Sequence, residues 1–167
     1  ARKIDPTDSM WATNGAGYEY NDQYGFGGVD AHKAVTLARN WTNVGEEESI
    51  VTSTSYASAS IPDSDSIGVT SSISVSESIK IESVEIVVDI THTYRGDLEL
   101  ILSSPDGTES ILTRSTGYDY SPNLDWTFTS LKNWGETSAG TWQLTVKDLL
   151  SGDTGTLDSW SLKIHGN

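Results

Sequence analysis

A two-residue hydrophobic rhythm dominates this chain beyond Gly45 and restricts its fold more than any other feature. Apolar residues occupy every second position in three stretches: Val84, Ile86, Val88 and Ile90; Leu98, Leu100 and Leu102; and Trp142, Leu144 and Val146. Successive side chains of a β-strand point to opposite faces, so this spacing predicts strands with one buried face. The pattern therefore favours a layered β structure.

Turn-forming residues separate these stretches. Ser104–Gly107 predicts a hairpin, Gly135–Gly140 marks a second connection, and Ser151–Gly155 marks a third. Glycine, proline, serine and aspartate supply the backbone angles and local hydrogen bonds that tight turns need. Many short strands with no helix among them predict an all-β antiparallel sandwich, with a jelly roll as the expected topology.

The serine-rich stretch 49–78 is also interpreted as strands rather than as a linker. Its apolar residues recur at even separations and leave the hydroxyls on the solvent face. They are Ile67, Val69, Ile73 and Val75, followed by Ile79 and Ile81.

The first 45 residues follow a different pattern. Val29–Trp41 has apolar residues at three- and four-residue spacings, which predicts an amphipathic helix, and Asn14–Gly28 is predicted to be loop. We place a short linker at 42–48. The expected division is a first segment of residues 1–45 and a sandwich of residues 46–167.

The formal net charge of -14, with only 10 Lys and Arg, argues against nucleic acid and against an anionic membrane surface as partners. The chain contains no cysteine, so disulfides and thiolate metal sites are excluded. No apolar run approaches the length of a membrane span. An acidic surface of this kind suits calcium, salt or a basic partner.

The order of motifs beyond residue 90 resembles the P-domain of kexin- and furin-type proprotein convertases and their bacterial relatives. The matching segments are Ile90–Leu100, Leu102–Thr108, Asp125–Phe128, Trp134–Glu136, Gly140–Trp142 and Gly155–Leu162. No single segment is specific, but the ordered series is. The resemblance implies a non-catalytic β-sandwich that supports the folding, stability or regulation of a secreted, extracellular subtilisin-like serine endopeptidase.

The first segment resembles the C-terminal end of a subtilase catalytic domain, where a glycine-rich loop leads into a last helix. The segments that carry this likeness are Asp5–Thr7, Asn14–Tyr18 and Tyr24–Ala31. The resemblance implies that the partner is the cognate catalytic domain in the same polypeptide, and that Ala1 marks an internal cut. Residues 1–41 are expected either to dock on the sandwich or to be poorly ordered.

We expect no catalysis from these residues. The subtilase motifs that hold the catalytic Asp, His and Ser have no match here, and the sequence lacks the Gly-x-Ser-x-Gly elbow of other hydrolases. The available histidines are His32, His92 and His165. His92 follows a predicted strand and is interpreted as a hydrogen-bonded corner.

Calcium is the expected ligand, because hard cations take several oxygens from acidic turns. The predicted ligands are Asp63, Asp65, Asp148 and Asp153. Asp97 is expected to accept backbone N–H bonds or to pair with Arg114.

The aromatic residues divide into core and surface candidates. Trp126, Trp142 and Trp160 alternate with polar neighbours and are predicted to be buried, while Trp134 is expected at a surface or a seam between domains. The predicted interface with the catalytic domain comprises Tyr94, Tyr118, Tyr120 and Trp134. The alternative function is a calcium-assisted carbohydrate- or matrix-binding module that directs the protease to its substrate.

Overall fold

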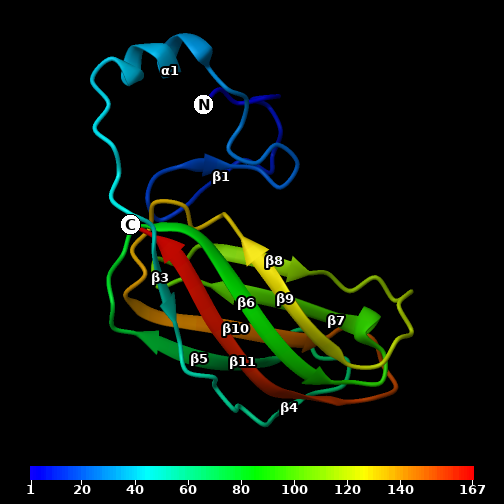
Figure 1. The fold of residues 1–167 in the computed structure, drawn as a ribbon. Helices are drawn as coiled ribbons and strands as arrows, with labels where there is room; N and C mark the ends of the chain where they lie inside the picture. Colours follow the sequence, from blue (N-terminus) through cyan, green and yellow to red (C-terminus); the bar gives the residue numbers. More distant parts are fainter.

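Two antiparallel sheets face each other in the computed structural model, which describes residues 1–167 (Figure 1). One sheet contains, in spatial order, β5 (Val69–Val75), β10 (Gly140–Asp148), β7 (Leu98–Ser103) and β8 (Glu109–Thr113). The other contains β3 (Glu48–Val51), β11 (Gly155–Gly166), β6 (Ile81–Thr91) and β9 (Leu124–Ser130), and β4 (Ala59–Ile61) also pairs with β11.

The strand order is that of a jelly roll. If β3 and β4 are counted as one interrupted strand, the strands in chain order lie 1-8-3-6 in one sheet and 2-7-4-5 in the other. Every pairing is antiparallel. The predicted antiparallel sandwich and its topology are confirmed.

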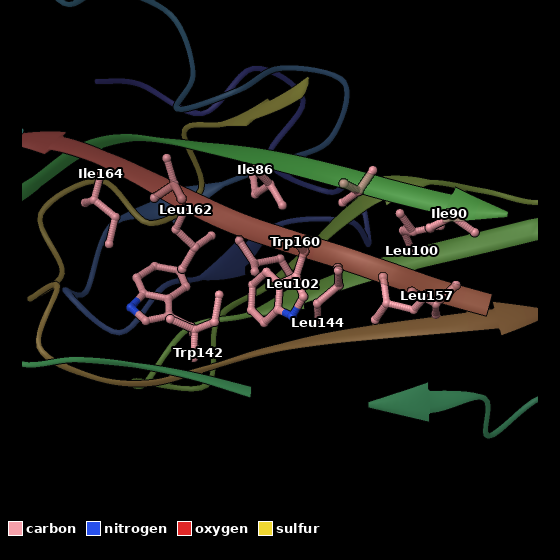
Figure 2. Close-up of a cluster of buried hydrophobic side chains, with 14 of the residues drawn as sticks. Ile86, Ile90, Leu100, Leu102, Trp142, Leu144, Leu157, Trp160, Leu162 and Ile164 are labelled. Atoms are coloured by element: carbon pink, nitrogen blue, oxygen red, sulfur yellow. The ribbon is translucent and has the colours of Figure 1, made fainter. Parts of the chain in front are cut away.

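The core lies between the sheets and consists of the residues that the two-residue rhythm marks. Val84, Ile86, Val88 and Ile90 of β6 have no exposed surface, and neither do Leu98, Leu100 and Leu102 of β7. Trp142 and Trp160 fill the space between β10 and β11, as predicted (Figure 2). Each such indole buries on the order of 150–250 Å², so these two rings are major contributors to sandwich stability.

Trp126 was predicted to be buried, and this prediction is wrong. Its side chain is 59% exposed although it points to the inner face of β9. Both β9 and β8 are edge strands of their sheets and do not pair with each other, so the sandwich is open between them. Trp126 lies at this opening.

Ile67 also departs from the expected pattern. It is 79% exposed and precedes β5, in a turn where its N–H donates to Asp65 Oδ1 at 2.7 Å. By contrast, Ile73, Val75, Ile79 and Ile81 are buried as the even spacing predicts. The turn before β5 therefore exposes Ile67, although the two-residue spacing of apolar residues predicts that it is buried.

The predicted hairpin at Ser104–Gly107 joins β7 to β8. Gly107 N–H donates to Ser104 O at 3.0 Å, and Gly107 adopts φ of 84°, which favours glycine. The residues of the turn itself therefore favour its conformation.

The N-terminal segment adds a small β-pair and one helix. β1 (Ala12–Thr13) pairs with β2 (Glu19–Tyr20), and α1 spans Ala31–Ala38. Of these elements, only the two-residue β2 interrupts the stretch 14–28 that was predicted to be loop. The helix is shorter than predicted. Asp30 caps its start by accepting from Lys33 N at 3.0 Å, and Asn40 and Trp41 continue only as turns.

The part of the N-terminal segment around β1 and β2 lies against the sandwich, whereas α1 stands away from it (Figure 1). The chain then runs through exposed residues 42–47 to β3. No helix of the structure has the length and apolar character that crossing a membrane requires.

Candidate functional site

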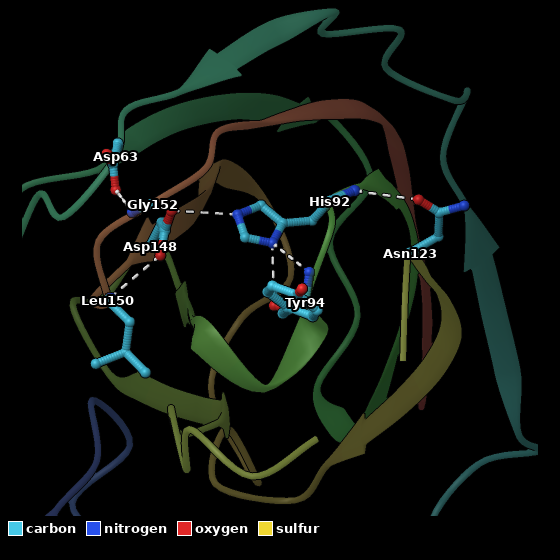
Figure 3. Close-up of polar contacts among 7 residues, drawn as sticks. All are labelled: Asp63, His92, Tyr94, Asn123, Asp148, Leu150 and Gly152. Atoms are coloured by element: carbon cyan, nitrogen blue, oxygen red, sulfur yellow. Dashed lines mark hydrogen bonds and ion pairs between the residues drawn. The ribbon is translucent and has the colours of Figure 1, made fainter. Parts of the chain in front are cut away.

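The end of β6 delivers a histidine to the interior of one end of the sandwich. His92 follows the last residue of β6 and is 2% exposed, and its own N–H donates to Asn123 Oδ1 at 3.1 Å. Its Nδ1 lies 3.0 Å from the carbonyl oxygen of Tyr94, and its Nε2 lies 3.2 Å from Asp148 Oδ2 (Figure 3). The corner predicted for His92 is therefore hydrogen-bonded through both ring nitrogens.

Gly155 leaves room for this imidazole. A Cβ at Gly155 would lie 2.4 Å from His92 Cδ2 and 2.6 Å from the carbonyl oxygen of Thr91. A larger residue would displace the ring or the end of β6, so glycine at the start of β11 fixes where the imidazole lies.

Two carboxylates from the β10–β11 connection meet the imidazole. Asp148 ends β10 and is fully buried; its Oδ1 accepts from Leu150 N at 3.2 Å, which leaves Oδ2 directed at His92. Asp153 Oδ2 is buried and has no hydrogen-bond partner. One ligand atom from each of His92, Asp148 and Asp153 lies within 4.8 Å of the others, an arrangement that can hold a metal ion.

A third carboxylate borders the group. Asp97 ends the short 3₁₀ helix η1 (Arg95–Asp97) and is 8% exposed. Burial raises the pKa of the Asp97 carboxyl above its ordinary value, and the negative charges of Asp153 and Asp148 raise it further. We name His92, Asp97, Asp148 and Asp153 the His92 cluster.

A second polar arrangement joins the N-terminal segment to the sandwich. Asn14 Nδ2 donates to the carbonyl oxygens of Lys132 and Trp134, both at 2.9 Å. Gly15 N–H donates to Glu136 Oε1 at 2.8 Å, and the hydroxyl of Thr108 donates to the same oxygen.

The acceptor of this arrangement is a buried acid. Glu136 is 2% exposed, and its Oε2 accepts from Asn133 Nδ2 at 3.0 Å. A buried carboxylate is stabilised only by such donors, so the contacts are specific rather than incidental. We name Asn14, Gly15, Thr108, Asn133 and Glu136 the docking seam.

A family model described as the proprotein convertase P-domain matches residues 81–164, which include most of the sandwich and all four residues of the His92 cluster. The chain belongs to the proprotein convertase P-domain family. Residues 81–164 contain β6 to β10 and nearly all of β11, so the match covers the His92 cluster and the sandwich side of the docking seam.

Curated relatives of the P-domain chain are proteases. Over 175 residues it is 35% identical to Protease KEX1 of Kluyveromyces lactis, with 99% of this chain and 23% of that protein covered. It is 34% identical to human proprotein convertase subtilisin/kexin type 7, with 100% of this chain and 22% of that protein covered. The chain thus spans less than a quarter of the length of these relatives.

A solved structure shares both the sandwich and the N-terminal segment. The serine protease of Aeromonas sobria superposes with a TM-score of 0.82 at 26% identity, covering 94% of this chain and 33% of that one. The P-domain chain is therefore similar to one part of a longer protease.

The structure brings together two of the four predicted calcium ligands. Asp148 and Asp153 lie in the His92 cluster, whereas Asp63 and Asp65 lie outside it and use Oδ1 to accept from Gly152 N at 3.0 Å and from Ile67 N at 2.7 Å. His92 and Asp97 were not predicted as members. One feature of the sequence could have indicated them: His92 directly follows the apolar stretch of β6, and Asp97 directly precedes that of β7.

Arg114 pairs with Asp22 at 3.6 Å rather than with Asp97. The structure thus connects Arg114 to the N-terminal segment. Neither contact expected for Asp97 is therefore present: Arg114 pairs with Asp22, and no backbone N–H donates to the Asp97 carboxylate, whose pKa is raised mainly by burial.

The predicted interface residues fall into two groups. Tyr94 and Tyr120 pack edge to face with ring centroids 5.9 Å apart near η1, and Tyr118 beside them is exposed. Trp134 lies at the docking seam, where its ring contacts Phe26 edge to face at 6.0 Å, and it remains half exposed. Trp134 therefore lies at a contact between the two segments of this chain.

Proposed function

We propose that this P-domain supports the folding and stability of a subtilisin-like catalytic domain in the same polypeptide and performs no proteolysis itself. The observation that carries the proposal is the docking seam. A segment resembling the end of a catalytic domain is fixed to the sandwich through the buried Glu136 and the amide of Asn14. The proposed boundary lies between residues 45 and 46.

The helix that follows the seam supports the same role. Val35 and Leu37 of α1 are more than half exposed, and so is Trp41 beyond its end. An amphipathic helix normally buries its apolar face, so these side chains need a partner that the sandwich does not provide. We propose that the catalytic domain covers them.

The physical mechanism is linkage. A domain that binds only the folded form of its neighbour stabilises that form, and a covalent connection makes the local concentration of the binding surface high. The geometry of the histidines fits an accessory role: His92 and His165 face carboxylates rather than serine hydroxyls.

The test is to express the parent protease with and without residues 46–167. We expect the shortened protein to mature poorly and to lose activity at lower temperature. Maturation with unchanged heat resistance would refute the stabilising role. We also propose that the parent is secreted, which fractionation of cells and medium would check.

A calcium response forms part of the proposal. Asp63 and Asp65 contact the β10–β11 connection that carries Asp148 and Asp153, since Asp65 N–H donates to Asp148 O at 2.8 Å and Asp63 accepts from Gly152. We expect excess calcium to raise the melting temperature relative to chelator. Identical melting in both conditions would remove calcium from the proposal.

The opening between β8 and β9 favours a second candidate function, carbohydrate or matrix binding. A groove of about 310 Å³ there is lined by the exposed Trp126 together with Arg95, Arg114 and Asp119. An aromatic face with adjacent polar groups suits stacking against a sugar ring.

Glycan-array binding that disappears in Trp126→Ala would support this second function. Trp134→Ala is the matched control, because Trp134 lies at the docking seam and not in the groove. No binding to any glycan, or equal loss in both variants, would count against it.

A further inference from the structure

The His92 cluster carries an inference that is independent of protease stabilisation. We propose that His92, Asp148 and Asp153 bind a single divalent ion of the zinc class, with Asp97 as an adjacent carboxylate. His92 comes from the β6–β7 connection, Asp148 from the end of β10 and Asp153 from the β10–β11 connection. Figure 3 shows His92 and Asp148 facing each other.

The donors are oriented as metal ligands usually are. The Nδ1 of His92 lies 3.0 Å from Tyr94 O and 3.2 Å from Tyr94 N, so the backbone of Tyr94 fixes the ring with its Nε2 directed at Asp148. The tautomer that carries its hydrogen on Nδ1 donates to Tyr94 O and offers the Nε2 lone pair to a metal ion. Asp148 is held in the same way, because Leu150 N–H binds its other oxygen. Ligating side chains are typically fixed by hydrogen bonds of this kind at their remaining atoms.

One donor lacks any other partner. Asp153 Oδ2 is inaccessible to solvent and accepts no hydrogen bond, although a buried carboxylate oxygen without a partner is costly. A bound ion at the centre of the cluster supplies the missing interaction. It also balances the negative charge that Asp148 and Asp153 bring to one place.

The ligand set selects the class of ion. Imidazole nitrogen suits zinc and similar transition metals, whereas calcium takes six to eight oxygens. The cluster offers one imidazole and few carboxylates, and both side-chain groups of the His92–Asp148 pair are fully buried, which leaves little room for water ligands. Asp63 and Asp65, whose oxygens would suit calcium, lie outside the cluster.

The experiment is zinc binding to the chain of residues 1–167 after removal of metals by chelator. Competition against a chromophoric zinc indicator gives stoichiometry and affinity, and cobalt substitution gives the visible absorption of a nitrogen- and oxygen-ligated site. We expect one zinc per chain. We also expect a rise in melting temperature of roughly 5–10 °C at an ion concentration about 100 times the dissociation constant.

Asp153→Asn removes one ligand from a partly exposed turn and preserves the shape of the side chain. We expect it to weaken zinc binding at least about tenfold, the range found when an outer hydrogen-bonding partner of a metal ligand is removed. Circular dichroism of the metal-free variant checks that it folds. His92→Gln is the second variant, and it should abolish the cobalt spectrum.

His165→Gln and Asp63→Asn are the matched controls. His165 lies between Glu47 and Glu85, 3.1 and 3.4 Å away, and is the other place where an added ion could bind adventitiously. Both controls should keep zinc affinity.

No zinc binding by the wild-type chain, unchanged affinity in Asp153→Asn, or loss in His165→Gln instead would overturn the proposal. A melting temperature that responds to calcium and not to zinc would also overturn it. Zinc binding is measured with residues 1–167 alone. Its outcome is therefore independent of whether the P-domain stabilises a catalytic domain.

Discussion

The loop that covers η1 is held by an ion pair at the surface and by backbone hydrogen bonds between Gly96 and residues 116–119. Arg95 Nε donates to Asp119 Oδ2 at 2.7 Å, while Ser121 N–H donates to Oδ1 at 3.0 Å. Next to it, Gly96 packs directly on the backbone of Asp119, since a Cβ at Gly96 would lie 2.6 Å from Asp119 N. The Arg-Gly-Asp sequence thus serves three separate contacts: an ion pair, a close backbone approach and the His92 cluster.

The hydrogen bond from Arg95, with those from Ser121, lowers the pKa of the Asp119 carboxyl to about 2. A carboxyl whose pKa is lower in the folded than in the unfolded state stabilises the fold above the unfolded value, and this contribution is lost as pH falls through about 2. We predict that carbon-13 NMR titration will find this midpoint, and that Arg95→Gln will return it toward 3.8.

Lys163→Gln is the control for that titration, because Lys163 lies on β11 and does not contact Asp119. It should leave the Asp119 midpoint unchanged. An Asp119 midpoint near 3.8 in the wild-type chain would show that the ion pair does not persist in solution.

At the scale of strands, the two-residue rhythm predicts burial well wherever a strand is central. Ile86 and Val88 on β6 are flanked by β11 and β9, so their inner faces are covered from both sides. Trp126 occupies a position in the same two-residue pattern, but β9 is an edge strand beside the opening of the sandwich. Whether a strand lies at an edge depends on the order of the strands in space. Sequence alone does not specify that order residue by residue.

The same limit applies to the His92 cluster. His92 and Asp148 are 56 positions apart in sequence, and only the pairing of β7 with β10 brings their connections together. The acidic turn that contains Asp153 could be predicted from its turn residues. The position of the His92 imidazole next to this turn could not be predicted, because no local sequence spacing relates His92 to Asp153.

A core substitution on β6 tests how much of the stability comes from this covered face. Ile86→Ala leaves a cavity between the sheets, and we predict a loss of about 2–5 kcal/mol in the free energy of unfolding, measured with urea. Val87→Thr changes the next residue, which faces solvent, and should cost within about 0.5 kcal/mol. Equal losses from the two substitutions would mean that β6 does not bury the face seen in the structure.

At the scale of the whole chain, the molecule is a sandwich with a segment fixed to its surface and a helix projecting from that segment (Figure 1). Asp22 adds a second attachment, since it contacts Lys132 at 2.6 Å as well as Arg114. Part of residues 1–41 therefore docks on the sandwich, which is one of the two alternatives expected for that stretch. The docking contacts come from residues 14–26, whereas α1 is a helix with no buried residue.

Glu136→Ala tests whether the docking seam holds that segment in place. The substitution removes the acceptor of the Thr108 hydroxyl and of the Asn133 amide and leaves Gly15 N–H only its bond to Thr108 Oγ1, and an unpartnered buried donor costs about 1–3 kcal/mol. We predict that amide hydrogen exchange will accelerate on the order of tenfold to a hundredfold at Gly15 and Tyr18. Exchange in β6 should change little, because the seam lies outside the core.

Glu77→Gln is the matched control, because Glu77 is an exposed acid whose carboxylate accepts from the side chain of its neighbour Ser76 and contacts no residue of the seam. It should leave exchange at Gly15 unaltered. If Glu136→Ala instead accelerated exchange equally in β6 and in the N-terminal segment, Glu136 would be a determinant of global folding. Local acceleration confined to residues 12–20 would establish that the seam opens independently, as attachment between a sandwich and the end of a neighbouring domain requires.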